Sequence, residues 1–205
     1  MKHRLVWVLI FIFCGGSAIA QREKAHSVSL KNASDGHLLN SSRLPIRGKY
    51  HRVLKRTVEQ AQHYGTDELV SVLLRAAKKV ATQYPRSVMV VGNLSRKKGG
   101  DLTGSVSHNS GRDVDIAFYI KRKNKLIKAS PDFLRFDENG QAGDYQFDVA
   151  RNWALVSTVL SDKRVQVQWM FVSTGLRQLM LEHAKKVGAS KTLMERAADV
   201  LGQPG

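Results

Sequence analysis

Five segments of the chain place apolar residues at the three- and four-residue intervals of an amphipathic helix. The clearest follows Thr66, an N-cap residue type, and carries Asp67 and Glu68 where the helix dipole favours acidic groups. Pro85 ends it. The five predicted helices cover residues 50–63, 66–84, 147–160, 176–187 and 193–201.

Three further segments are rich in β-branched residues and predict strands, at residues 87–94, 113–120 and 165–172. The second alternates regularly, so its side chains divide between two faces of a sheet. One face would hold Val114, Ile116, Phe118 and Ile120, and the other Asp113, Asp115, Ala117 and Tyr119. Asp115 is therefore expected to face away from the apolar core. Helices and strands together predict a mixed protein, without specifying its topology.

The first twenty residues have the pattern of a secretory signal peptide. A basic start precedes the apolar run 5–13, which is about half as long as a bilayer span requires, and Ala18-Ile19-Ala20 is a small-residue cleavage signal. We expect cleavage after Ala20 and export to the periplasm. Cys14, the single cysteine, offers a lipoprotein alternative, which is disfavoured because Phe13 stands where a small residue is needed. The mature chain would then have no disulfide.

Residues 21–43 are polar, with no sustained apolar period, and predict a flexible leader before a domain over residues 44–205. The formal net charge is +16. For an exported protein, such an excess indicates contact with anionic envelope polymers or a lipid surface. No nucleic-acid partner is expected, because the chain contains no recognised nucleic-acid motif.

The run 107–115, Ser-His-Asn-Ser-Gly-Arg-Asp-Val-Asp, holds the main candidate chemistry. His108 and Asp115 are both residue types that bind zinc, and a loop imidazole and a strand carboxylate can converge on one ion. Asp113, Arg112 and Ser107 are candidates for orienting a ligand or binding substrate. On these residues alone, a surface or capping role for His108 is the more frequent one. The chain lacks the Gly-x-Ser-x-Gly context of a serine nucleophile.

Several motifs resemble the penicillin-insensitive murein endopeptidases, zinc peptidases related to D-alanyl-D-alanine peptidases and to the hedgehog domain. They lie at residues 92–96, 99–100, 107–116 and 147–155, and the pattern Ser-His-x-Ser/Thr-Gly-x-Asp-x-Asp is the most specific. The resemblance implies an α+β fold, in which helices flank a small, mainly antiparallel sheet. It also implies hydrolysis of D-alanyl to diaminopimelate cross-links in peptidoglycan by a metal-activated water.

The resemblance implies that His108 and Asp115 are two of three protein ligands to one zinc ion. The third ligand in the family comes from a His-x-His segment, a motif that does not occur in this chain, and a catalytic base is expected beyond Gly205. Two interpretations follow: a C-terminally truncated enzyme, or an inactive cell-wall-binding relative. In either case residues 21–205 alone are expected to hydrolyse cross-links weakly.

Overall fold

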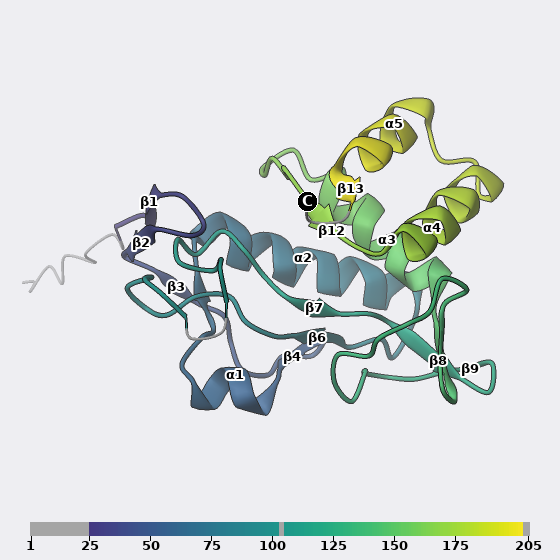
Figure 1. The fold of residues 1–205 in the computed structure, drawn as a ribbon, viewed down its shortest axis with the longest axis horizontal. Helices are drawn as coiled ribbons and strands as arrows, with labels where there is room; N and C mark the ends of the chain where they lie inside the picture. The colour runs from purple at the N-terminus through teal and green to yellow at the C-terminus, as the bar shows by residue number, and fades with distance from the viewer. Residues whose placement is uncertain (1–24, 103–104, 203–205) are drawn as a thin grey trace, which may run out of the picture.

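The computed structural model describes residues 25–102 and 105–202. It has a mixed α+β fold with small, mainly antiparallel sheets, as the resemblance implies (Figure 1). The described helices are α1 (Lys55–Glu59), α2 (Asp67–Gln83), α3 (Val149–Leu160), α4 (Thr174–Lys186) and α5 (Lys191–Val200). The described strands are β1 (Val28–Lys31), β2 (Gly36–Leu39), β3 (Ser42–Arg43), β4 (His51–Val53), β5 (Tyr64–Gly65), β6 (Met89–Val91), β7 (Ile116–Ala117), β8 (Ile120–Arg122), β9 (Lys125–Leu126), β10 (Gln141–Ala142), β11 (Tyr145–Phe147), β12 (Met170–Phe171) and β13 (Leu201–Gly202).

Helix α2 and the sheet β4-β6-β7 form the first core (Figure 1). The Thr66 hydroxyl accepts a hydrogen bond from the Leu69 amide at 3.2 Å, so the predicted N-cap is confirmed. Strand β6 lies parallel to β4 and antiparallel to β7. Their inward side chains meet the apolar face of α2, and the buried members are Val53, Met89, Val91, Val70, Leu73, Ala77 and Val80.

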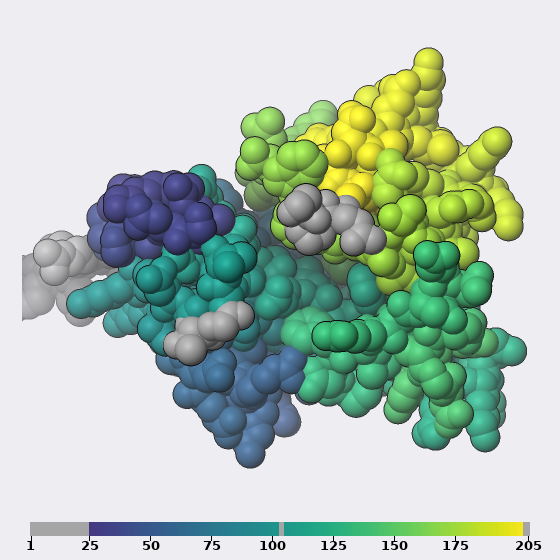
Figure 2. Space-filling view, in the orientation of Figure 1, coloured from purple at the N-terminus to yellow at the C-terminus, as the bar shows by residue number. Residues whose placement is uncertain are grey.

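Helices α3, α4 and α5 enclose a second core, which includes Trp153, Leu160, Leu176, Met180 and Ala197. Ala154 of α3 belongs to the first core, so this helix joins the two. In the space-filling view the α4–α5 region stands apart from the β1–β2 hairpin, and the surface is hollowed between them (Figure 2). No helix in the described part of the chain is long and apolar enough to cross a membrane.

The predicted helix over 50–63 is wrong for its first half. His51 to Val53 form strand β4, because the amide of Met89 donates to the Tyr50 carbonyl and draws this segment into a parallel pair with β6. Only α1 is helical. Apolar spacing of three and four residues does not distinguish a helix from a strand followed by a turn, and here a partner distant in sequence decides.

The predicted strand 113–120 divides into β7 and β8, which belong to different sheets. The alternation holds as far as Ala117. Tyr119 then turns into the first core instead of staying on the face of Asp115. Likewise, only Met170–Phe171 of the predicted strand 165–172 pairs as β12.

Strands β1, β2 and β3 lie within residues 21–43, where the sequence predicts a flexible leader. Leu38 of this region is 1% exposed. The predicted signal peptide, its cleavage point and Cys14 lie outside the described residues.

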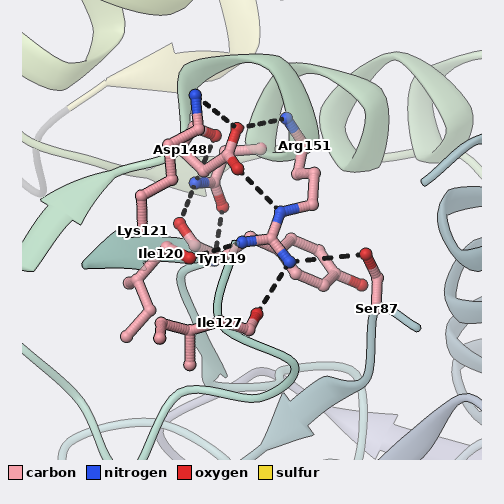
Figure 3. A network of polar contacts seen from close by, with 8 residues as sticks. Ser87, Tyr119, Ile120, Lys121, Ile127, Asp148 and Arg151 are labelled. Carbon is pink, nitrogen blue, oxygen red and sulfur yellow. Dashed lines mark hydrogen bonds and ion pairs between the residues drawn. The ribbon is translucent and has the colours of Figure 1, made fainter. Parts of the chain in front are cut away.

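A buried ion pair joins the start of α3 to the strands beside it (Figure 3). The Arg151 Nε donates to Asp148 Oδ2 at 2.8 Å, and both side chains are 1% exposed. The same guanidinium donates to the carbonyls of Ile120 and Ile127 and to the Ser87 hydroxyl. Through these contacts Arg151 connects α3 to β8 and to the segment before β6.

Candidate metal-binding site

His108 and Asp115 converge at the end of the β4-β6-β7 sheet. The His108 Nε2 lies 3.4 Å from Asp115 Oδ1, with the histidine side chain 8% exposed and the aspartate 43% exposed. Asp115 directly precedes β7 and alternates with Val114 and Ile116, which pack against the α2 core. Ala117 packs with Leu54 and Val90 in a cluster separate from the α2 core. The prediction that Asp115 faces away from that core is therefore confirmed.

The main chain of Asp115 is held on both sides by the residues that follow β6. Its carbonyl accepts from the Gly92 amide at 2.8 Å, and its amide donates to the Asn93 carbonyl at 2.9 Å. The Asn93 side chain is itself fixed, because the fully buried Thr57 donates its hydroxyl to Asn93 Oδ1 at 2.9 Å. These contacts position the Asp115 carboxylate.

His108 has a φ of +73°, which is unfavourable for a residue with a Cβ. Neighbouring contacts hold it there: its amide donates to Asp113 Oδ2 at 3.3 Å, and the amide of Asn109 donates to the Ala33 carbonyl at 3.0 Å. The Asn109 side chain also donates to Asp101 Oδ1 at 2.7 Å. Backbone strain that persists under such constraint is typical of functional positions.

The β1–β2 hairpin packs directly against this loop, and two glycines permit the approach. Gly111 has a φ of +72°, and a Cβ there would lie 2.5 Å from Leu38 Cδ2. Gly99 has a φ of +71°, and a Cβ there would lie 2.2 Å from the Asn109 carbonyl oxygen. The hairpin, predicted as a leader, therefore braces the loop that carries His108.

The other predicted site residues lie around the pair. Asp113 contacts the His108 main chain and not its ring. Arg112 donates to the Lys31 carbonyl at 3.0 Å, a structural pairing with β1. The amide of Ser107 donates to the Ser105 hydroxyl at 3.3 Å, within its own turn.

The electrostatics of the pair are set by two opposing effects. Burial disfavours the charged imidazole, but the Asp115 carboxylate and the nearby Asp113 outweigh it and raise the pKa of His108 above its ordinary value of 6.5. The Nδ1 atom of His108 is buried and has no hydrogen-bond partner in the described part of the protein. The pair thus attracts positive charge, and one ring nitrogen is unsatisfied.

The two donors fit a zinc ion as part of a ligand set. Atoms that each lie about 2.1 Å from a tetrahedral zinc ion are about 3.4 Å apart, and the Nε2–Oδ1 separation is 3.4 Å. Within residues 25–102 and 105–202, no group of three or more metal-ligating side chains is close enough to hold an ion. His183 lies on α4, whose buried residues belong to the second core. The described residues therefore offer two candidate ligands and not a complete set.

Sequence reasoning did not identify Thr57 or the β1–β2 hairpin as supports of the site. Both act through contacts between residues distant in sequence. The only sequence signal for this support was the pair of glycines, Gly99 and Gly111, which stand where only a residue without a Cβ fits.

Comparisons with known proteins give a consistent result. A family model described as penicillin-insensitive murein endopeptidase matches residues 29–195. Proteins named penicillin-insensitive murein endopeptidase from Escherichia coli O1:K1 / APEC, strain SMS-3-5 / SECEC and O45:K1 strain S88 are each 27% identical over 105 residues. The aligned stretch covers 51% of this chain and 37% of each relative. The chain thus spans little more than a third of the length of these relatives.

Proposed function

The chain belongs to the penicillin-insensitive murein endopeptidase family, and on that premise we propose that it hydrolyses peptidoglycan cross-links with the help of one zinc ion. The bond is the amide between a D-alanyl carbonyl and a diaminopimelate amine. Hydrolysis adds water across this bond, so that the C–N bond breaks and a carboxylate and a free amine form. His108 and Asp115 are the proposed zinc ligands.

The observation that carries this proposal is the geometry of the pair. An imidazole nitrogen and a carboxylate oxygen lie 3.4 Å apart, on a sheet face away from the α2 core. The loop beside them is held in a strained conformation.

Each residue of this site has a physical task in the proposal. Asp113 fixes the His108 main chain, and Asn93 fixes that of Asp115, so the two donors are oriented before any ion arrives. Zinc, when bound, polarises a scissile carbonyl and acidifies water. We assign the third ligand and the general base to no described residue.

We also propose export to the periplasm, supported by the signal-peptide pattern of residues 1–20 and by the family. The excess positive charge favours anionic envelope polymers or lipid over nucleic acid as additional contacts. Mass spectrometry of the protein from a periplasmic extract would show a mature N-terminus at Gln21. An N-terminus at Cys14 would instead establish the lipoprotein alternative.

The function is tested by incubating the purified protein with zinc and murein sacculi and separating the released muropeptides. We expect cross-linked dimers to decline slowly and monomers to appear. A chelator, His108→Ala and Asp115→Ala should each stop the release. His183→Ala is the matched control, because it removes a histidine from α4, and it should leave the release unchanged.

Three outcomes would contradict parts of the proposal. Loss of activity in His183→Ala would move the ligand assignment to α4. Full activity in His108→Ala would remove the zinc assignment. Retention on sacculi without any release would favour the alternative function, a wall-binding relative without catalysis.

A further inference from the structure

The segment Ala129–Phe133 lies over the same sheet face as Asp115. Ala129 packs on the cluster formed by Leu54, Val90 and Ala117. Four residues further on, the Phe133 ring reaches Gly92: a Cβ on Gly92 would lie 2.5 Å from Phe133 Cζ and 3.2 Å from Asp115 Cβ. The Phe133 ring and the Asp115 side chain therefore both approach the same side of Gly92.

Two arginines fasten this segment in place. Arg52 donates to the Ser130 carbonyl at 2.5 Å. Arg56 pairs with Asp132 at 2.5 Å, and its guanidinium carbon lies 5.2 Å from the centre of the Phe133 ring. The Asp132 hydrogen bond, and with a smaller contribution the charge of Asp115, raises the pKa of Arg56. The segment is thus fastened at two points, and the ring itself lies against Arg56.

Despite these contacts, Phe133 remains 39% exposed. A buried ring would be explained by core packing, and a mobile exposed ring would need no explanation. A ring held beside the proposed metal ligands, with part of it open to solvent, offers an apolar surface to a bound molecule. Gly92 permits this arrangement, because the absence of a Cβ leaves room for the ring to approach Asp115.

We propose that Phe133, positioned by Arg56 and Gly92, forms the apolar wall of the substrate subsite next to Asp115. This inference rests on the proposed function. The wall fits a peptide with a small apolar side chain beside the scissile carbonyl, and the alanyl methyl group of a peptidoglycan stem peptide has that chemistry. The ring face packs against the methyl group and the flat amide, while the opposite side of the ring stays against Arg56.

The test measures the Kd of a purified cross-linked muropeptide dimer for the full chain, with Phe133→Ala, Phe133→Leu and Phe171→Ala. We expect Phe133→Ala to weaken binding about 5- to 10-fold, and Phe133→Leu to restore part of the loss. Phe171 is 61% exposed, on β12, and is the matched control; its replacement should leave the Kd unchanged. Zinc binding and thermal unfolding should be the same in all four proteins.

Gly92→Ala is a second variant, since the new methyl group would displace the ring without removing it. In Gly92→Ala the new Cβ would also lie 3.2 Å from Asp115 Cβ, so zinc binding by this variant is measured alongside. It should weaken dimer binding to a similar extent. Unchanged binding by both Phe133→Ala and Gly92→Ala would overturn the subsite while leaving the proposed function intact. Failure of the wild-type protein to bind the dimer would overturn the substrate class, and the subsite with it.

Discussion

Two ion pairs in the described part of the protein, Asp148–Arg151 and His108–Asp115, are built on opposite principles. Around Asp148 and Arg151, the guanidinium donates to a carboxylate, two carbonyls and a hydroxyl (Figure 3). Around His108 and Asp115, the carboxylate is 43% exposed, one ring nitrogen lacks a partner, and the histidine backbone is strained. Both pairs are held by the fold, but only one leaves bonding capacity unused.

This difference separates stabilising charge from charge available for chemistry. Inside a protein an unsatisfied polar group costs free energy, so a fully partnered pair is what stability alone selects. The His108 pair gives up that benefit. In our proposal a metal ion would bind His108 Nε2 and the part-exposed Asp115 carboxylate, and four predictions test the contrast.

The largest effect should come from breaking the structural pair. Arg151→Met leaves the buried Asp148 carboxylate without the guanidinium, with only the Lys121 ammonium 3.9 Å away. We expect a loss of about 3–5 kcal/mol in the free energy of unfolding, measured by urea denaturation. The control is Arg164→Met, which removes an arginine whose side chain is 68% exposed in its pair with Asp162. It should change stability little. Equal effects of the two substitutions would show that the buried network is not stabilising.

A second substitution tests how the β1–β2 hairpin braces the loop that carries His108. Gly99→Ala places a Cβ 2.2 Å from the Asn109 carbonyl at a φ of +71°, so we expect a loss of about 2–3 kcal/mol in stability and weaker zinc binding. Gly143→Ala is matched to it, because Gly143 also has a positive φ but nothing within 4 Å of its Cβ position. That variant should lose only about 1 kcal/mol. If both variants behave alike, the close approach has no energetic consequence.

The strain at His108 should appear as a difference in stability between its glycine and alanine variants, and this effect is smaller than the previous two. Because φ is +73°, His108→Gly should be more stable than His108→Ala by about 1 kcal/mol, and both should lose zinc binding. At His183, inside α4, the order should reverse, since glycine is about 1 kcal/mol worse than alanine in a helix. Thermal unfolding of the four variants measures both orders. The same order at both sites would mean that His108 is unstrained.

The pH dependence of the metal-free protein should show the weakest effect. Since the pKa of His108 is raised above 6.5 by Asp115, the pair stabilises the fold below that unfolded-state value. The contribution is lost as pH rises through the folded-state pKa. The stability gap between wild type and Asp115→Asn should therefore shrink as pH rises from below 6.5 through the raised folded-state pKa of His108.

Zinc affinity should follow the opposite trend, rising with pH, because proton and metal compete for one nitrogen. Titration calorimetry across the same pH range measures it. A stability gap that widens with pH would contradict the direction of the His108 pKa shift.

The sequence predicted the parts of the fold that local signals specify. Helix α2 has an N-cap, acidic first-turn residues and a terminating proline, and each acts within a few residues of its position. Strand β4 was missed because its structure depends on pairing with β6, more than thirty residues away. Tyr119 was placed on the wrong face because the alternation ends where the chain passes from one sheet to another.

The candidate site was predicted in part for the same reason. His108 and Asp115 stand in a dense local motif, so the sequence was enough to name them. The supports from Leu38, Thr57 and Phe133 were not predictable, because each reaches the site from a segment distant in sequence. The complete ligand set stays a prediction, since no described residue joins the pair.

The central claim is that His108 and Asp115 bind one metal ion, and the most direct test is zinc titration of ¹⁵N-histidine-labelled protein by NMR. The account predicts that the ring nitrogen signals of His108 shift on saturation with one equivalent of zinc. It also predicts that Asp115→Asn weakens this binding at least about tenfold, while the signals of His183 stay in place. Zinc-dependent shifts at another histidine, with His108 unchanged, would contradict it.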